Sequence, residues 1–194
     1  MKTRTDLLNF LIKKHGLKSY CELGTQVRAI NFDKIECEDK FCVDIDPNAK
    51  ADFTGSTDDF FKQLNRNYDL YLIDASHIAE DVKRDFENAL KVLSPNGFIV
   101  LHDCNPLKEE HTIVPRPTKT GHWNGDVYRF ASTLSVNDGF CTIDIDNGVG
   151  IFQNGIDPDG YEYFDTPIFW NYFSENRKRL LNLICWEEFT KLNP

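Results

Sequence analysis

Four side chains that can do acid–base or metal-ligand chemistry stand directly after two apolar stretches of the chain. Asp74 and His77 follow the run YDLYLI, and His102 and Asp103 follow FIVL. Imidazole titrates near neutral pH and can take a proton from a hydroxyl group, while carboxylates can orient it or hold a divalent cation. One such residue would be an ordinary strand cap, but four favour a functional site.

The segment that carries these residues predicts how they are brought together. Residues 68–73 form a near-continuous apolar run, and residues 79–93 carry apolar side chains at helical spacing. The stretch SPNG at 94–97 predicts a turn, and residues 98–101 predict a second buried strand. Two strands joined by a crossover helix are parallel, and such sheets bind ligands at the carboxyl ends of their strands. We therefore expect all four polar side chains to meet at one edge of the sheet.

The first part of the chain adds a pattern for a nucleoside-containing cofactor. Gly24 ends a short apolar strand at 19–23, and Asp44 follows it by twenty residues. A glycine at the first turn lets a ligand approach the backbone, and a carboxylate about 20 residues on meets a ribose diol. The stretch GTQVRAI has one glycine, which disfavours pyrophosphate and with it NAD or FAD. Glu22 would repel phosphate and suits a ligand that carries positive charge.

The remaining patterns predict a single α/β domain over residues 1–194, with a doubly wound, mostly parallel, Rossmann-like sheet that ends in an antiparallel hairpin. Upstream, strands are expected at 40–43 and 51–54, a helix at 58–65, and weak helical character at 25–35. Downstream, the patterns indicate a long loop at 107–123 and a helix at 123–134. A hairpin follows at 140–153, and an aromatic-rich helical tail runs from 161 onward.

Composition excludes several classes of protein. A net charge of −9 and a pI near 5.0 argue against a general nucleic-acid binder, because phosphate contacts need clustered Lys and Arg. The opening MKTRTDLLNFLIKKHG predicts an amphipathic helix too polar for a signal peptide, and no apolar run reaches membrane-spanning length. We therefore expect a cytoplasmic location and no membrane span. The six cysteines form no CxxC pair, so free thiols are expected and a zinc site is not.

Six motifs follow one another along the chain, namely YCELG (20–24), VDIDP (43–47), STDDFF (56–61), LIDASH (72–77), SPNGFIVLHDCNP (94–106) and WNGDVYRF (123–130). Their order and spacing resemble the class I S-adenosylmethionine-dependent methyltransferases, in particular the small branch associated with O-methylation of sugars and glycans. The resemblance implies the methyltransferase form of the Rossmann-like fold, S-adenosylmethionine as cofactor, and transfer of a methyl group to a hydroxyl of a sugar, a glycan or another small molecule.

The resemblance also implies a cofactor site. Asp44 would hold the ribose hydroxyls of S-adenosylmethionine. The residues expected around the whole cofactor, from the methionine end to the adenine, are Glu22, Gly24, Asp74, Asp44, Ser56, Thr57 and Asp58. Some sugar methyltransferases of similar arrangement hold magnesium with carboxylates from two strand ends, and here these would be Asp74 and Asp103.

On the acceptor side, a sugar hydroxyl needs a base because it is a poor nucleophile at neutral pH. His77 is the first candidate for this base and His102 the second. The side chains expected to border or close the acceptor pocket are His102, Asp103, Asn105, Trp123 and Asp126. The partner is thus a small-molecule or glycan acceptor, and the oligomeric state, a homodimer included, is open.

Two other classes remain as alternatives. An NAD-dependent nucleotide-sugar enzyme would carry a glycine-rich pyrophosphate loop and a Tyr-x-x-x-Lys motif, and the sequence has neither. A module that binds cofactor without catalysis would tolerate the reduced first loop, but it would not need the acidic and imidazole side chains at three strand ends.

Overall fold

The structure is a computed structural model that describes residues 1–118, 121–155, 161–162 and 167–192. In these residues one eight-stranded sheet runs in the order β3-β2-β1-β4-β5-β7-β6-β8. The strands are β1 (Ser19–Leu23), β2 (Asp39–Asp44), β3 (Phe53–Thr54), β4 (Tyr68–Ile73), β5 (Leu93–Leu101), β6 (Phe140–Ile143), β7 (Val149–Gln153) and β8 (Leu183–Ile184). The neighbouring strands among the first five (β3-β2-β1-β4-β5) pair in parallel, and β7 is antiparallel to both β5 and β6. The expected doubly wound, mostly parallel sheet with an antiparallel pair is confirmed.

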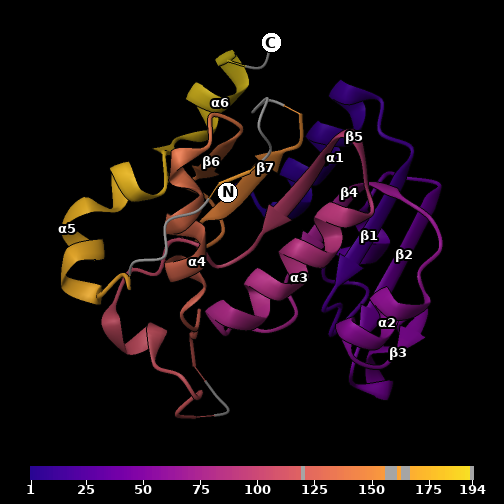
Figure 1. Ribbon diagram of the computed structural model, residues 1–194, viewed down its shortest axis with the longest axis horizontal. Helices are drawn as coiled ribbons and strands as arrows, with labels where there is room; N and C mark the ends of the chain where they lie inside the picture. The colour runs from indigo at the N-terminus through magenta and orange to yellow at the C-terminus, as the bar shows by residue number, and fades with distance from the viewer. Residues whose placement is uncertain (119–120, 156–160, 163–166, 193–194) are drawn as a thin grey trace.

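Helices cover both faces of this sheet (Figure 1). They are α1 (Arg4–His15), α2 (Thr57–Gln63), α3 (Ala79–Lys91), α4 (Val127–Thr133), α5 (Trp170–Leu180) and α6 (Trp186–Leu192). α2, α3, α4 and α5 pack into one apolar cluster, and α1 and α6 pack into a second on the opposite face. Among the described residues, every helix is too short or too polar to cross a membrane.

The central strands explain why the sheet is parallel and buried. In β4, Tyr71 and Ile73 belong to the cluster under α3, while Leu70 and Leu72 belong to the cluster under α1. A strand with apolar side chains on both faces needs helices on both sides, and crossover helices provide them. The register pairs Ile73 with Leu101, so the residues that follow β4 and β5 emerge side by side.

Several local predictions were wrong in detail. The stretch SPNG is not a turn before β5 but lies inside it, where Asn96 has a φ of 60° and the register with β4 shifts. Residues 25–35 contain no α-helix but only a short 3₁₀ turn (Phe32–Lys34), because Gly24 and Gln26 both have positive φ. The helix expected from residue 123 begins at Val127.

The C-terminal region also adds an element that the sequence did not predict. The two-residue β8 pairs in parallel with β6 at the far edge of the sheet. It is too short to show any alternation of polarity, so it could not be found by pattern. The six cysteines are free thiols, as expected, and Cys21, Cys42 and Cys104 are buried.

Candidate functional site

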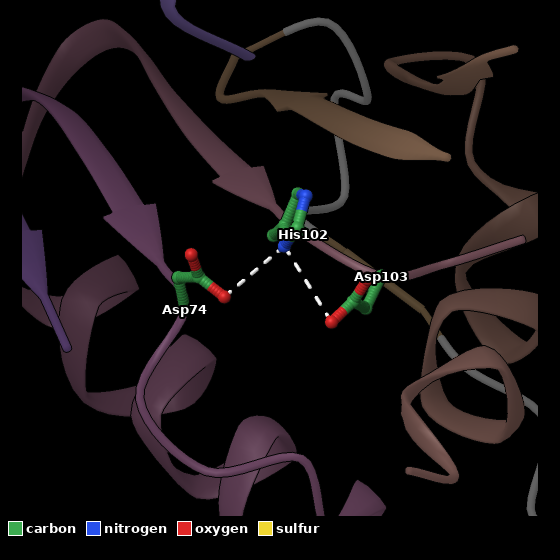
Figure 2. Close-up of side chains that lie close together, drawn as sticks. All are labelled: Asp74, His102 and Asp103. Carbon is green, nitrogen blue, oxygen red and sulfur yellow. Dashed lines mark hydrogen bonds and ion pairs between the residues drawn. The ribbon is translucent and has the colours of Figure 1, made fainter. Parts of the chain in front are cut away.

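The polar residues after β4 and β5 meet at the sheet edge, as the βαβ pattern predicted. His102 Nδ1 lies 3.1 Å from Asp74 Oδ1 and 3.6 Å from Asp103 Oδ2. Figure 2 shows the two carboxylates approaching the imidazole from the tips of the two strands. Asp103 has a φ of 62°, in the left-handed region that few non-glycine residues adopt.

His77 forms a second imidazole–carboxylate pair in the same cluster. Its Nδ1 lies 3.0 Å from Asp103 Oδ2, and its Nε2 lies 3.9 Å from Asp74 Oδ1. The ring stacks on Trp123 with centroids 4.8 Å apart and planes 18° from parallel. Burial lowers the pKa of His77, but the hydrogen bond to Asp103 and the charges of both carboxylates outweigh it and raise that pKa.

The segment WNGD clamps the loop that carries His77. The Asn124 side chain is fully buried and donates to Asp103 Oδ1 at 2.7 Å. Gly125 has a φ of +64°, and a Cβ placed there would lie 1.9 Å from the His77 carbonyl oxygen. The backbone N–H of Asp126 donates to that same carbonyl at 3.0 Å. Only glycine therefore allows the approach, and the motif holds His77 in place.

His102 is held in a different electrostatic environment from His77. On its other ring nitrogen, Nε2 lies 3.6 Å from Asp146 Oδ2, in the turn between β6 and β7. Burial alone would lower the pKa of His102, but the charge of Asp74 and the interaction with Asp146 raise it to about 10. His102 is therefore a cation at neutral pH and does not act as a base there.

Arg4 supplies a further cation that no sequence pattern predicted. It is the first residue of α1, and its Nη1 donates to Asp146 Oδ2 at 3.0 Å, while its Nε lies 3.5 Å from Asp74 Oδ2. The interaction joins residues 142 positions apart in the chain. No local spacing marks such a contact, because it depends on how α1 packs across the sheet.

Glu22 is the buried acid of the site. It is 2% exposed, and its Oε2 accepts hydrogen bonds from the Tyr20 hydroxyl at 2.5 Å and the Asn31 amide at 2.6 Å. Burial raises the pKa of Glu22 to about 7, although both hydrogen bonds act in the opposite direction. Close to neutral pH, this group can thus carry a proton or a charge.

Two cavities lie along the carboxyl ends of β1, β2 and β4. The first, of about 480 Å³, is lined by Glu22, Asp74, His77, His102, Asp103 and Trp123, among others. The second, of about 390 Å³, includes Ser56 and Thr57. Both cavities are lined by Gly24, Asp44 and Ala75. Because the two cavities share these residues, they form one elongated cleft with Gly24 and Asp44 at its middle.

The middle of the cleft is shaped by Gly24 and Asp44. Gly24 has a φ of +87°, and a Cβ there would lie 2.3 Å from the backbone oxygen of Asp74. Only glycine therefore allows the loops after β1 and β4 to approach each other this closely. Asp44 Oδ2 accepts from the Gln26 N–H at 2.6 Å, and Oδ1 accepts from the Asp46 N–H at 2.8 Å. The carboxylate thus fixes two loops while it lines both cavities.

Three predicted site residues lie outside the cleft. Asn105 is buried between Asp144, to which it donates, and the Arg177 guanidinium, from which it accepts. The side chain of Asp126 accepts from the N–H of Ala79 and so caps the start of α3. Asp58 is partly exposed on α2 and pairs with Arg84. These side chains support the site but do not line it.

The cluster of Asp74, His102 and Asp103 is the one group of potential metal ligands found among the described residues, with one ligand atom from each lying within 4.8 Å of the others. Both oxygens of Asp74 lie next to a cation, and those of Asp103 face Asn124 and His77. Magnesium prefers oxygen ligands and would meet a charged imidazole here. The donor set therefore does not suit magnesium, and the metal site stays a prediction.

Comparisons with known proteins give a partial family match and several structural likenesses. Residues 28–104 match a family described as a methyltransferase domain. The chain has no significant match among curated protein sequences. Three similar solved structures, each aligned over about four-fifths of both chains, are an O-methyltransferase of Bacillus cereus in complex with SAH (S-adenosylhomocysteine), a putative caffeoyl-CoA O-methyltransferase of Staphylococcus aureus, and the SAH-bound methyltransferase PaMTH1 of Podospora anserina.

These three likenesses rest on structure and not on sequence. The B. cereus protein is 15% identical with a TM-score of 0.54, and covers 79% of this chain and 81% of its own. The S. aureus protein is 19% identical with a TM-score of 0.55, covering 78% and 83%. The P. anserina protein is 17% identical with a TM-score of 0.56, covering 85% and 80%. The chain therefore has the Rossmann-like methyltransferase fold.

Proposed function

We propose that this protein is an S-adenosylmethionine-dependent O-methyltransferase that acts on a hydroxyl of a sugar or glycan. The observation that carries the proposal is the elongated cleft at the strand ends, with an imidazole–carboxylate pair, His77 and Asp103, at one end of it. The similar B. cereus and S. aureus structures are named as O-methyltransferases, and the B. cereus and P. anserina proteins were solved with SAH; both observations support the same assignment.

The two joined cavities and their acidic lining support S-adenosylmethionine as the ligand. The second cavity can take the adenine, and the first can take the methionine portion next to Glu22 and Asp74. Asp44 lies between them, where the ribose would be. A carboxylate has about four lone-pair sites, and the two backbone N–H groups that bind Asp44 use one on each oxygen. The remaining sites can accept both ribose hydroxyls.

The residues at the reactive end suit removal of a proton from an acceptor hydroxyl. The bound cofactor supplies an electrophilic methyl group. Asp103 binds His77 at Nδ1, which leaves Nε2 as the nitrogen that can take the proton of the acceptor hydroxyl. Trp123 and the clamp around Gly125 hold the ring in this orientation. His102, a cation at neutral pH, stabilises the charge of Asp74 and is not the base.

The acceptor class is supported by the walls of the first cavity. Most of its lining side chains are polar or charged, and they include Gln26, Asp46 and Arg116 in addition to the strand-end cluster. Such walls suit a ligand rich in hydroxyl groups better than an aromatic one. Trp123 is a wall of this cavity, but His77 occupies one face of its ring. Another small-molecule hydroxyl is the alternative acceptor.

Calorimetric titration with SAH tests the cofactor assignment. We expect the wild-type protein to bind SAH, and Asp44→Asn to bind at least about tenfold more weakly, because one hydrogen bond to a charged group is worth about 1.5–3 kcal/mol. The matched control is Asp39→Asn, at the opposite end of the same strand and outside both cavities. Binding of NAD but not SAH, or equal SAH affinity in the two variants, would contradict the assignment.

Transfer of labelled methyl groups to a panel of sugars and phenols tests the reaction and the acceptor class. In His77→Gln, turnover should fall roughly 10²–10⁴-fold while SAH affinity is kept. His122→Gln, in the exposed loop, is the control. If phenols receive the labelled methyl group and sugars do not, the alternative acceptor replaces the sugar. Full turnover in His77→Gln would remove His77 from the reaction.

A further inference from the structure

Asp85 is a buried carboxylate on the inner face of α3, where the other buried residues are apolar. It is 1% exposed, and its buried neighbours on the helix are Val82, Phe86 and Ala89. A carboxylate at such a position destabilises the fold unless it is paired. Asp85 therefore needs a partner that is either a cation or a hydrogen-bond donor.

The described part of the chain does not supply this partner in full. Asp85 Oδ1 is buried and has no hydrogen-bond partner there. Arg84, the next residue along α3, directs its guanidinium to Asp58 and Asp81 instead. Burial raises the pKa of Asp85 to about 6, which is what an incompletely paired carboxyl shows. A donor from outside the chain would complete the site.

The position of Asp85 shows where this donor comes from. Asp85 lines the second cavity of the cleft, together with Ser56, Thr57 and Ile45. Gly24 and Asp44 join that cavity to the first. If the ribose lies at Asp44 and the methionine portion at Glu22, as in the proposed function on which this step rests, the purine base occupies the cavity next to Asp85.

We infer that Asp85 accepts a hydrogen bond from the exocyclic amino group of the cofactor's adenine and so selects a 6-aminopurine over a 6-oxopurine. An ionised carboxylate only accepts hydrogen bonds, so it pairs with the amino group of adenine and repels the 6-oxo group of hypoxanthine. The Ser56 hydroxyl already donates to Asp59 Oδ2, and the Thr57 hydroxyl is hydrogen-bonded to Asp85 itself. Asp85 Oδ1 is therefore the buried acceptor of this cavity that has no partner among the described residues.

The test is calorimetric titration at about pH 8, where Asp85 is ionised, with SAH and with its 6-oxo analogue S-inosylhomocysteine. We expect wild-type protein to bind SAH at least about tenfold more tightly than the analogue. In Asp85→Asn this preference should shrink to less than about threefold, because a carboxamide can donate to the 6-oxo group. The control is Asp58→Asn, which lies at the same α2–α3 junction outside the cavity and should keep the preference.

The outcomes separate this inference from the proposed function. If wild-type protein binds SAH and Asp85→Asn keeps the full preference, the inference is wrong and the methyltransferase assignment stands. If wild-type protein binds neither ligand, the proposed function fails first. Thermal melting checks folding, and Asp85→Ser provides a second variant, so an unchanged preference in either folded variant overturns the role of Asp85.

Discussion

Replacing Glu22 with glutamine tests the electrostatics of the buried end of the cleft. Glu22 Oε2 accepts hydrogen bonds from Tyr20 and Asn31, and the side chain is 2% exposed. Burial raises its pKa to about 7. A glutamine carbonyl oxygen can accept the same two hydrogen bonds, so the substitution removes the ionisable group and leaves the packing in place.

The expected magnitude follows from the pKa difference between the folded and unfolded chain. Between about pH 4.5 and pH 7 the folded chain keeps the Glu22 proton while the unfolded chain releases it. The free energy of unfolding therefore falls as the pH rises through this window, and it stays at the lower value above it. With 1.36 kcal/mol for each pKa unit, the loss amounts to about 3 kcal/mol. Glu22→Gln should lack this loss.

Urea unfolding between about pH 4.5 and about pH 8 measures the effect by linear extrapolation. Above pH 7, Glu22→Gln should be more stable than wild type by up to about 3 kcal/mol, and near pH 4.5 the two should be equally stable. Glu36→Gln, an exposed position outside both cavities, is the control and should follow the wild-type curve. A difference between Glu22→Gln and wild type that does not change with pH would refute the reasoning.

Three further predictions concern the cofactor, the clamp and the metal. S-adenosylmethionine, which carries a sulfonium, should gain affinity relative to neutral-sulfur SAH as the pH rises through about 7 and Glu22 ionises, and calorimetry should show no such gain in Glu22→Gln. Gly125→Ala should lose turnover more than about tenfold in a methyl-transfer assay, because its Cβ would meet the His77 carbonyl, while Gly121→Ala, with positive φ but open space, should lose only about 1–3 kcal/mol of stability. Turnover should persist in excess EDTA, because Arg4 and His102 already supply the positive charge beside Asp74. A chelator-sensitive rate would restore the metal site.

The centre of the fold could be predicted because β4 and the second half of β5 are buried on both faces and are therefore near-continuous apolar runs. β4 and α3 begin at the residues that the patterns indicated. Ser56 caps α2 by accepting a hydrogen bond from the Asp59 N–H. The errors fall where backbone conformation overrides composition. Asn96 and Gln26 adopt positive φ without being glycine. Asn is enriched in this region and Gln is not, and in neither case does the local sequence decide the conformation.

The site was predictable as far as the topology of a βαβ unit determines it. Asp74, His102 and Asp103 meet because parallel strands end at the same edge, which is a rule about chain direction. The difference in pKa between the two imidazoles, His77 and His102, was not predictable. It depends on Asp146, which reaches His102 from a hairpin turn far along the chain. Asp126 was expected to help close the acceptor pocket, but its side chain accepts from the Ala79 N–H and caps the start of α3. Ile78, the residue before that helix, makes no side-chain cap.

Arg4 shows most clearly why sequence patterns could not complete the site. The helix that carries it has the composition of an ordinary surface helix, and its buried residues pack under the sheet. That packing brings the guanidinium to Asp74 and Asp146 at the mouth of the first cavity. Carboxylates that cluster at neighbouring strand ends and in the β6–β7 turn repel one another unless cations lie between them. The fold meets this need with an arginine from α1 and an imidazolium from β5, so the N-terminal helix is a part of the site as well as of the core.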